Sequence, residues 1–141
     1  LGAAYVGRSG EKEVPIMIHH AVLGSLGRFI GILLEEHGAS LPFWLAPDLV
    51  AILPVSEVQR AAAADFRDRL LEMDVRPRLL DQSETLSRRV VMAREAGAPV
   101  LAIIGAREAD AGQVALKEGG VQRSLPADVA VDELAARWRP R

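Results

Sequence analysis

The sequence contains no cysteine among its 141 residues, and aromatic residues make up only 4% of it. The lack of cysteine excludes a disulfide scaffold and any metal site built from thiolates. The longest apolar runs, such as Val100–Ile104, are far too short to cross a bilayer, and no basic region followed by an apolar stretch opens the chain. We therefore expect no membrane partner, and the composition agrees with a cytoplasmic protein.

A strong charge of either sign is also missing, because 17 Lys and Arg residues stand against 19 Asp and Glu, for a net charge of −2. No global positive field attracts nucleic acid, so we expect no DNA partner, and any RNA contact must be local. What the chain has in abundance is apolar residues, which form half of it and suffice for the core of one ordinary domain. The first residue is Leu1 rather than Met, and we interpret the chain as a fragment.

Proline and glycine punctuate the sequence up to residue 47 and predict a boundary there, between residues 1–47 and 48–141. In the first stretch, Ala3–Val6 and Val14–Ile18 are predicted as two short strands, followed by a helix from about residue 27 to residue 37. A hairpin and one helix leave too much apolar surface uncovered to form a domain alone. We therefore interpret this β-β-α stretch as a remnant of something larger.

Beyond the boundary, apolar and amphipathic stretches alternate, as in a sheet covered by crossover helices, and the predicted fold class is α/β. The predicted strands are Leu49–Val55, Arg76–Leu80, Val100–Ile104 and Gln113–Lys117, and the predicted helices are Glu57–Met73, Glu84–Ala96 and a last helix that carries Trp138. Arg107–Gly112 is predicted as a polar turn. The first of these helices has an apolar stripe that should pack on the sheet: Val58, Ala62, Phe66, Leu70 and Met73.

Two segments carry a resemblance to a known family: Pro15–Glu35, which reads PIMIHHAVLGSLGRFIGILLE, and Leu41–Pro47, which reads LPFWLAP. They resemble the stretch of threonyl-tRNA synthetases that runs through the third signature motif of class II synthetases into the linker before the anticodon-binding domain. The resemblance implies that residues 1–47 are the end of the catalytic core. It also implies that residues 48–141 are the anticodon-binding domain, a mixed sheet with helices on its faces.

The resemblance implies roles for four residues of the catalytic core. Arg28 matches the motif-three arginine, a catalytic residue whose guanidinium can fork onto ATP phosphates. Gly24 and Ser25 are implied as further ATP contacts, the first because it has no β-carbon and the second through its hydroxyl. His19 matches one of three protein ligands of zinc, and the chain has only three histidines. ATP and zinc are the implied cofactors. We expect neither to bind well to this chain alone, and we expect the chain alone not to aminoacylate tRNA.

Residues 48–141 resemble, more weakly, the anticodon-binding domain of the synthetases for threonine, proline, histidine and glycine. The family contacts tRNA through three sequence patterns, and the resemblance implies that this chain keeps part of each. Ser83 stands in place of an asparagine in the first pattern, Glu108 is retained in the turn of the second, and Lys117 is the basic residue left from the strand of the third. Five arginines lie close together in the sequence: Arg76, Arg78, Arg88, Arg89 and Arg94. They form either a patch that contacts tRNA phosphates, in which Arg88 and Arg89 would take part, or two solvated faces.

Two functions stay open from the sequence. The first is a C-terminal fragment of a threonine-tRNA ligase that binds the anticodon stem-loop of a threonine-accepting tRNA, with its catalytic site incomplete in this chain. The second is a divergent synthetase-like paralogue whose domain acts as a protein-interaction or dimerisation module without cognate anticodon reading. Gly27, His20 and Ser83 depart from the family pattern and favour the second. A homodimer is compatible with both.

Overall fold

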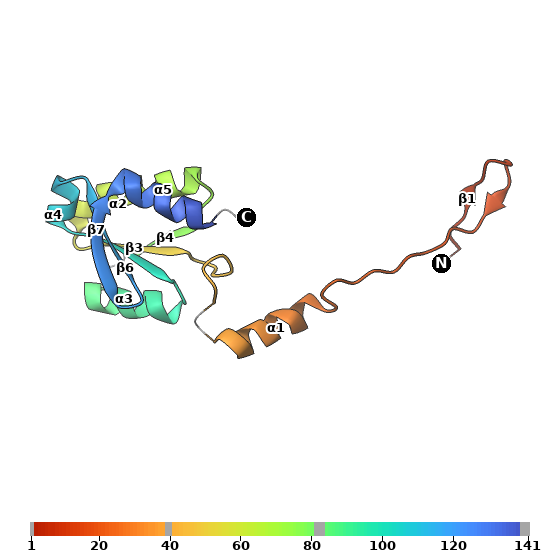
Figure 1. Cartoon of the computed structure of the whole chain (residues 1–141), viewed down its shortest axis with the longest axis horizontal. Helices are drawn as coiled ribbons and strands as arrows, with labels where there is room; N and C mark the ends of the chain where they lie inside the picture. The colour runs from red at the N-terminus through yellow and green to blue at the C-terminus, as the bar shows by residue number, and fades with distance from the viewer. Residues whose placement is uncertain (1, 39–40, 81–83, 139–141) are drawn as a thin grey trace. The chain divides into compact units, whose positions relative to one another are not determined.

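The computed structural model describes residues 2–38, 41–80 and 84–138. The chain divides into two compact units, Leu1–Leu33 and Leu34–Arg141, and the second unit holds the main sheet. Figure 1 labels most elements of the two units and colours them along the chain. Within the described residues, no helix is both long enough and apolar enough to span a membrane.

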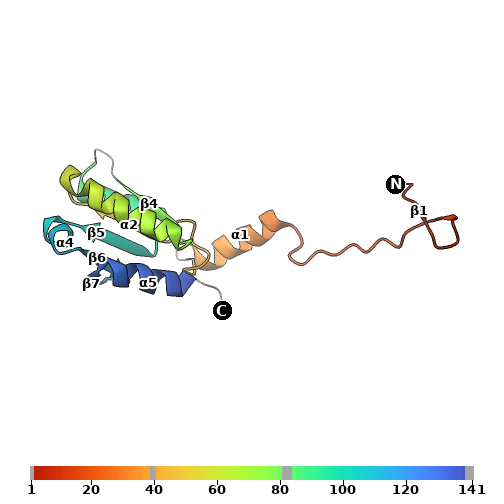
Figure 2. The ribbon, with the colours of Figure 1, turned by 90° about the horizontal axis from the view of Figure 1, so that it is seen from above.

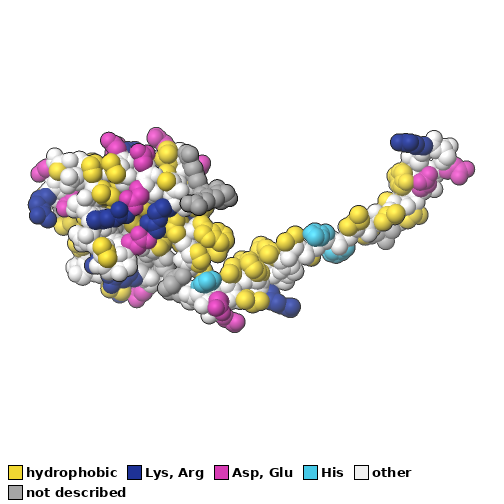
Figure 3. All heavy atoms as spheres, in the orientation of Figure 1, with side chains coloured by type: hydrophobic (Ala, Val, Ile, Leu, Met, Phe, Trp, Pro, Cys, Tyr) yellow, Lys and Arg dark blue, Asp and Glu magenta, His cyan; other side chains and the backbone are white. Residues whose placement is uncertain are grey.

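The first unit contains a small hairpin, in which β1 (Tyr5–Val6) pairs antiparallel with β2 (Lys12–Glu13). The amide of Gly7 donates to the carbonyl of Glu11 at 2.9 Å and closes the turn. The predicted strand at Val14–Ile18 is wrong, because these residues form no regular structure and are exposed. A short apolar run makes a strand only against a partner, and the described chain provides none here. Figure 3 shows hydrophobic side chains exposed along this unit.

The helix α1 (Leu26–His37) confirms the predicted helix and spans the division between the two units. None of its residues is buried, and Phe29 and Leu33 are its most sheltered side chains. Large apolar residues such as Ile30 and Leu34 are about half exposed. The helix is therefore defined by its own backbone hydrogen bonds and sequence pattern rather than by a core around it.

The second unit is built on a five-stranded sheet with the order β4-β3-β5-β6-β7. β3 (Val50–Pro54) lies between β4 (Pro77–Leu79) and β5 (Val100–Ile104) and pairs in parallel with both. β6 (Gln113–Glu118) pairs antiparallel with β5 and with β7 (Val121–Pro126). The mixed sheet confirms the predicted fold class, and all five residues of β3 are buried, as in a central strand covered on both faces.

Helices cover both faces of this sheet (Figure 1). α2 (Arg60–Glu72) and α5 (Ala127–Trp138) pack on one face, and α3 (Leu86–Glu95) packs on the other. In Figure 2, α2 lies over the β4 side of the sheet and α5 over the β7 side. The larger core, around Phe66, fills the α2 and α5 face, and a smaller one, around Leu101, lies beneath α3.

The apolar stripe predicted for the first long helix is correct in its middle and wrong at its start. Phe66 and Leu70 are buried in the larger core, and Met73 packs against it. Val58, however, is 84% exposed. It lies in a short 3-10 helix, η1 (Glu57–Gln59), which precedes α2. With three residues per turn instead of 3.6, η1 rotates Val58 away from the face that α2 buries.

Two further elements differ from the prediction. The polar turn expected at Arg107–Gly112 is wrong, because a short helix, α4 (Ala106–Asp110), occupies most of it. The strand β7 was not predicted at all. Its side chains are almost all exposed, so it lacks the apolar pattern that identified the other strands.

Candidate functional site

The residues matched to a nucleotide site lie at the start of α1. Gly24 has a φ of +64°, a left-handed conformation that glycine adopts without strain. The carbonyl of Ser25 accepts the amide of Phe29 at 3.0 Å and opens the helix. Arg28 lies in the first turn of α1, and its side chain is exposed. The three predicted ATP contacts are therefore grouped at one helix start, where each is open to solvent.

The predicted zinc ligand, His19, lies in the irregular segment ahead of α1 and is exposed. Zinc in proteins takes three or four ligands from Cys, His, Asp and Glu side chains. Among the residues that the structure describes, no three such side chains gather in a way that could hold a metal ion. The residues present thus do not form the zinc site by themselves, and His19 stays a single predicted ligand.

Lys117 lies on β6, on the same face of the sheet as α3. It is paired across the strands with Leu101 of β5, which packs in the core beneath α3, and directly paired side chains share a face. α3 packs mainly on β3, and at the far side of this face β7 carries exposed side chains, whereas Lys117 of β6 is half-buried and Ala115 is buried. Lys117 is paired there with Gln122, and the neighbouring Ser124 is exposed beside them. We call the surface formed by Lys117, Gln122 and Ser124 the open sheet face.

The two adjacent arginines of α3 have opposite environments. Arg88 is exposed, and its backbone amide donates to the Thr85 hydroxyl at 3.3 Å, which caps the helix. Arg89 is only 5% exposed. Its guanidinium donates to the carbonyls of Leu80 at 2.7 Å and Glu84 at 3.2 Å. Arg89 therefore ties the end of β4 to the start of α3, and its guanidinium is not presented to a ligand.

The remaining arginines of the predicted patch also divide. Arg76 donates to backbone carbonyls of the segment before β3, and Arg78 is paired with Asp48 at 3.2 Å. Arg94 is exposed on α3, like Arg88. Of the five arginines, only these two on α3 face solvent without an ion pair to a described residue.

Glu108 lies in α4, just beyond the carboxyl end of β5. Its Oε2 accepts the backbone amide of Gly105 at 3.1 Å and caps this helix. A β-carbon at position 105 would lie 2.7 Å from that oxygen, so glycine suits the position. The other oxygen, Oε1, lies 3.9 Å from the largely exposed guanidinium of Arg107. One carboxylate oxygen therefore serves the fold, and the other can accept a further donor. The prediction for Ser83 falls outside the described residues.

The predicted contacts do not converge on one point. Parallel strands place the starts of α3 and α4, with Arg88 and Glu108, at the edge formed by their carboxyl ends. The guanidinium of Arg89, which reaches the Val55 carbonyl at 3.5 Å, lies at the same edge. Lys117 is paired with Leu101, near the amino end of β5, which puts it about 10 Å from that edge at 3.3 Å per residue. A ligand that touches Arg88, Glu108 and Lys117 must extend across the sheet, which suits a polymer loop better than a small molecule.

Gln122 and Ser124 were not predicted as part of this surface, because β7 itself was not predicted. The stretch Val121–Pro126 alternates apolar and polar residues only weakly, and the side chains at 122 and 124 belong to the open sheet face. Two glycines with positive φ, Gly119 and Gly120, form the turn that joins β6 to β7. That Gly-Gly pair was the available signal for a hairpin at this point.

Comparison with known proteins agrees with this architecture. A threonine-tRNA ligase from Sulfurihydrogenibium sp. is 36% identical over 133 residues, which cover 94% of this chain and 20% of that protein. A threonine-tRNA ligase from Gloeobacter violaceus is 38% identical over 141 residues, covering 97% of this chain and 22% of that protein. The chain therefore spans about a fifth of the length of these curated relatives.

The RNA binding domain of threonyl-tRNA synthetase from Cryptosporidium parvum has a similar crystal structure, with a TM-score of 0.78 and 24% identity. The match covers 85% of this chain and 31% of that one and shows a shared fold. The family model described as "Anticodon binding domain" matches residues 49–137, which include every strand of the main sheet, helices α2 to α4, and α5 up to its last residue but one. This chain therefore belongs to the anticodon-binding domain family.

Proposed function

We propose that the chain is the C-terminal part of a threonine-tRNA ligase and that its second unit binds the anticodon stem-loop of a threonine-accepting tRNA. The relatives support the substrate class, since their similarity extends over more than nine tenths of the chain. The observation that carries the proposal is the open sheet face, where Lys117 lies beside the exposed polar side chains of Gln122 and Ser124. An RNA loop offers splayed bases and phosphates that such a face can contact.

The charges around this surface predict local binding rather than long-range attraction. The net charge of the whole chain is −2, whereas Arg88, Arg94 and Lys117 place three positive charges on the α3 side of the sheet. Three phosphate contacts to single-stranded RNA give a slope of about −2 for the logarithm of the binding constant against that of the salt concentration. Binding should thus weaken measurably, but not collapse, when salt is raised.

The nucleotide site is proposed for the longer protein, in which further residues would complete it. There Arg28 would neutralise charge on ATP phosphates, while Gly24 and Ser25 would lie against the nucleotide. His19 would supply one of the zinc ligands. No aminoacylation step is proposed for this chain by itself, and a cytoplasmic location belongs to the same proposal.

Binding of an anticodon stem-loop to the 141-residue chain, followed by fluorescence anisotropy, tests the RNA-binding role. Lys117→Ala should weaken binding several-fold, because it removes the positive charge of the open sheet face. Arg67→Ala is the matched control, since Arg67 belongs to α2, on the opposite face, and pairs there with Asp68 at 2.7 Å. Equal effects of the two substitutions would show that overall charge, and not this face, determines binding.

Glu108 needs a separate design because one of its oxygens caps α4. Glu108→Gln keeps an oxygen that can accept the Gly105 amide and removes the negative charge. We expect an unchanged melting temperature and a reduced preference for threonine tRNA over a non-cognate tRNA. If the wild-type chain binds no stem-loop at all, the proposal fails and the protein-interaction alternative takes its place.

A further inference from the structure

The segment Pro42–Pro47, which precedes the matched domain, is packed as part of the second unit. Ala46 is completely buried in the larger core, and Phe43 packs against that core. The amides of Leu45 and Ala46 both donate to the carbonyl of Pro42, at 2.8 and 3.1 Å, so the segment forms a closed turn. A free linker would have neither the burial nor these bonds.

Arg76 holds the backbone of this turn. Its guanidinium donates to three carbonyls, those of Trp44 at 3.1 Å, Ala46 at 2.8 Å and Pro47 at 3.1 Å. The same guanidinium lies 4.0 Å from the centre of the Trp138 ring at the end of α5. A planar guanidinium suits this double use, because its edge donates hydrogen bonds while its face stacks on an aromatic ring.

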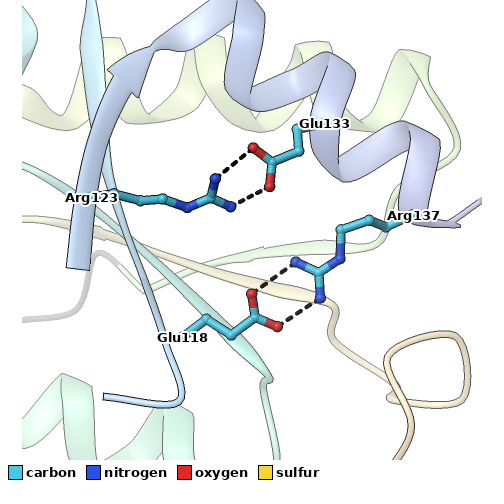
Figure 4. Close-up of polar contacts among 4 residues, drawn as sticks. All are labelled: Glu118, Arg123, Glu133 and Arg137. Atoms are coloured by element: carbon cyan, nitrogen blue, oxygen red, sulfur yellow. Dashed lines mark hydrogen bonds and ion pairs between the residues drawn. The ribbon is translucent and has the colours of Figure 1, made fainter. Parts of the chain in front are cut away.

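Arg137 makes a second connection, one residue earlier on α5. Its guanidinium lies 4.4 Å from the centre of the Phe43 ring. It also donates two hydrogen bonds to Glu118 at the end of β6, at 2.9 and 2.6 Å, as Figure 4 shows. The Arg137 side chain therefore connects the turn to Glu118 of β6. Lys117 precedes Glu118 on the same strand.

We propose that Arg76 and Arg137 form a clasp that holds Pro42–Pro47 in a fixed position on the anticodon-binding domain. Through Arg137 the clasp also couples this segment to strand β6. The clasp fixes the direction in which the polypeptide enters the domain. In a longer protein it would make the entry segment move with the domain, instead of acting as a flexible tether. The clasp is argued from contacts within the second unit alone, so a failure of the RNA-binding proposal would not refute it.

Hydrogen exchange of the full 141-residue chain tests the clasp at two amides, those of Leu45 and Ala46. Arg76→Ala should accelerate their exchange at least about tenfold, the factor that loss of one charge-assisted hydrogen bond carries. Arg78→Ala is the control, because Arg78 lies two residues away on β4 and its ion pair, with Asp48 at 3.2 Å, lies outside the turn. Unchanged exchange in Arg76→Ala would show that burial of Ala46 alone holds the turn, and would overturn the proposal.

The coupling to β6 has its own matched pair of variants. Figure 4 shows two double Arg–Glu pairs between α5 and the β6–β7 hairpin, Arg137 with Glu118 and Arg123 with Glu133. Only the first of these also contacts the turn. Glu118→Gln should accelerate exchange at Leu45 and Ala46 several-fold, and Glu133→Gln should leave it unchanged. Equal acceleration in both variants would mean that any loosening of α5 exposes the turn. It would then contradict a specific coupling between the turn and β6.

Trp138→Leu keeps the proposal testable if Arg76→Ala fails to fold. Leucine preserves apolar packing at the end of α5 but removes the ring beneath the Arg76 guanidinium. Brief chymotrypsin digestion of this variant should cut after Phe43 or Trp44 several-fold faster than in the wild-type chain, as read by mass spectrometry. Cleavage at the wild-type rate in this variant would overturn the role of the ring in the clasp.

Discussion

Replacing Arg89 tests whether this arginine serves the fold, and its neighbour Arg88 provides a control one residue away. Arg89 is 5% exposed, and it donates to Leu80 at 2.7 Å and to Glu84 at 3.2 Å. Arg89→Met keeps an unbranched apolar side chain in the same place. It removes the donors of these two bonds, at the junction between β4 and α3, and of the longer 3.5 Å bond to the Val55 carbonyl.

Hydrogen bonds to a charged group contribute about 1.5–3 kcal/mol each, and these two share one side chain, so we expect Arg89→Met to reduce the free energy of unfolding by about 3 kcal/mol. Arg88→Met changes an exposed position and should alter it by less than about 0.5 kcal/mol. Urea unfolding followed by circular dichroism measures both. The RNA-binding effects should reverse this order, with Arg88→Met the weaker binder. Equal unfolding free energies for the two variants would refute the structural role of Arg89.

Other substitutions test the core, a helix cap and an ion pair. Phe66→Ala should lower the free energy of unfolding by about 3–5 kcal/mol in urea titration, because the ring is fully enclosed in the larger core. Thr85→Ala removes the hydroxyl that caps α3 and should cost about 1 kcal/mol in the same assay. Hydrogen bonds from Arg137 lower the pKa of Glu118, so this pair stabilises the fold above the ordinary Glu pKa and its contribution is lost as the pH falls through the lowered value. Urea titrations at about pH 7 and about pH 3 measure how much free energy of unfolding is lost in acid. The loss should be smaller in Glu118→Gln than in the wild-type chain, and equal losses would contradict the assignment.

The pattern of apolar residues in the sequence predicted the elements that bury a continuous face. It missed the elements whose side chains are exposed. Val100–Ile104 is buried almost throughout, and its continuous apolar run was enough to identify it as a central strand. β7 is the edge strand of the described sheet, beside β6, and its exposed side chains give no hydrophobic face to detect. The failed strand at Val14–Ile18 is the converse case, since its apolar pattern is present but no described segment pairs with it.

Within α3, burial depends on which side of the helix meets the sheet, and that decided the roles of Arg88 and Arg89. Leu86, Val90 and Ala93 pack in the smaller core, and Arg89 lies on the same side of the helix at spacings of three and four. The signal was therefore present in the sequence. An arginine among apolar neighbours at helical spacing reads at first as a solvated charge, and only the carbonyls of Leu80 and Glu84 explain why it is buried.

Glu108 shows why a family position cannot be assigned one role from sequence. The spacing Gly105-x-x-Glu108 is also that of a helix capping box, in which the carboxylate accepts the amide three residues before it. A resemblance to a tRNA contact and a local structural need thus coincide at one residue. Geometry separates them, since one oxygen is used by the cap and the other is not.

The most direct test of the central claim is a titration of the 141-residue chain with threonine tRNA and with a non-cognate tRNA at two salt concentrations. We predict tighter binding to threonine tRNA, and weaker binding to both as salt rises, with a logarithmic slope of about −2 for three phosphate contacts. No binding to either tRNA, or equal binding to both that salt does not change, would contradict the assignment of an anticodon-binding role to this chain.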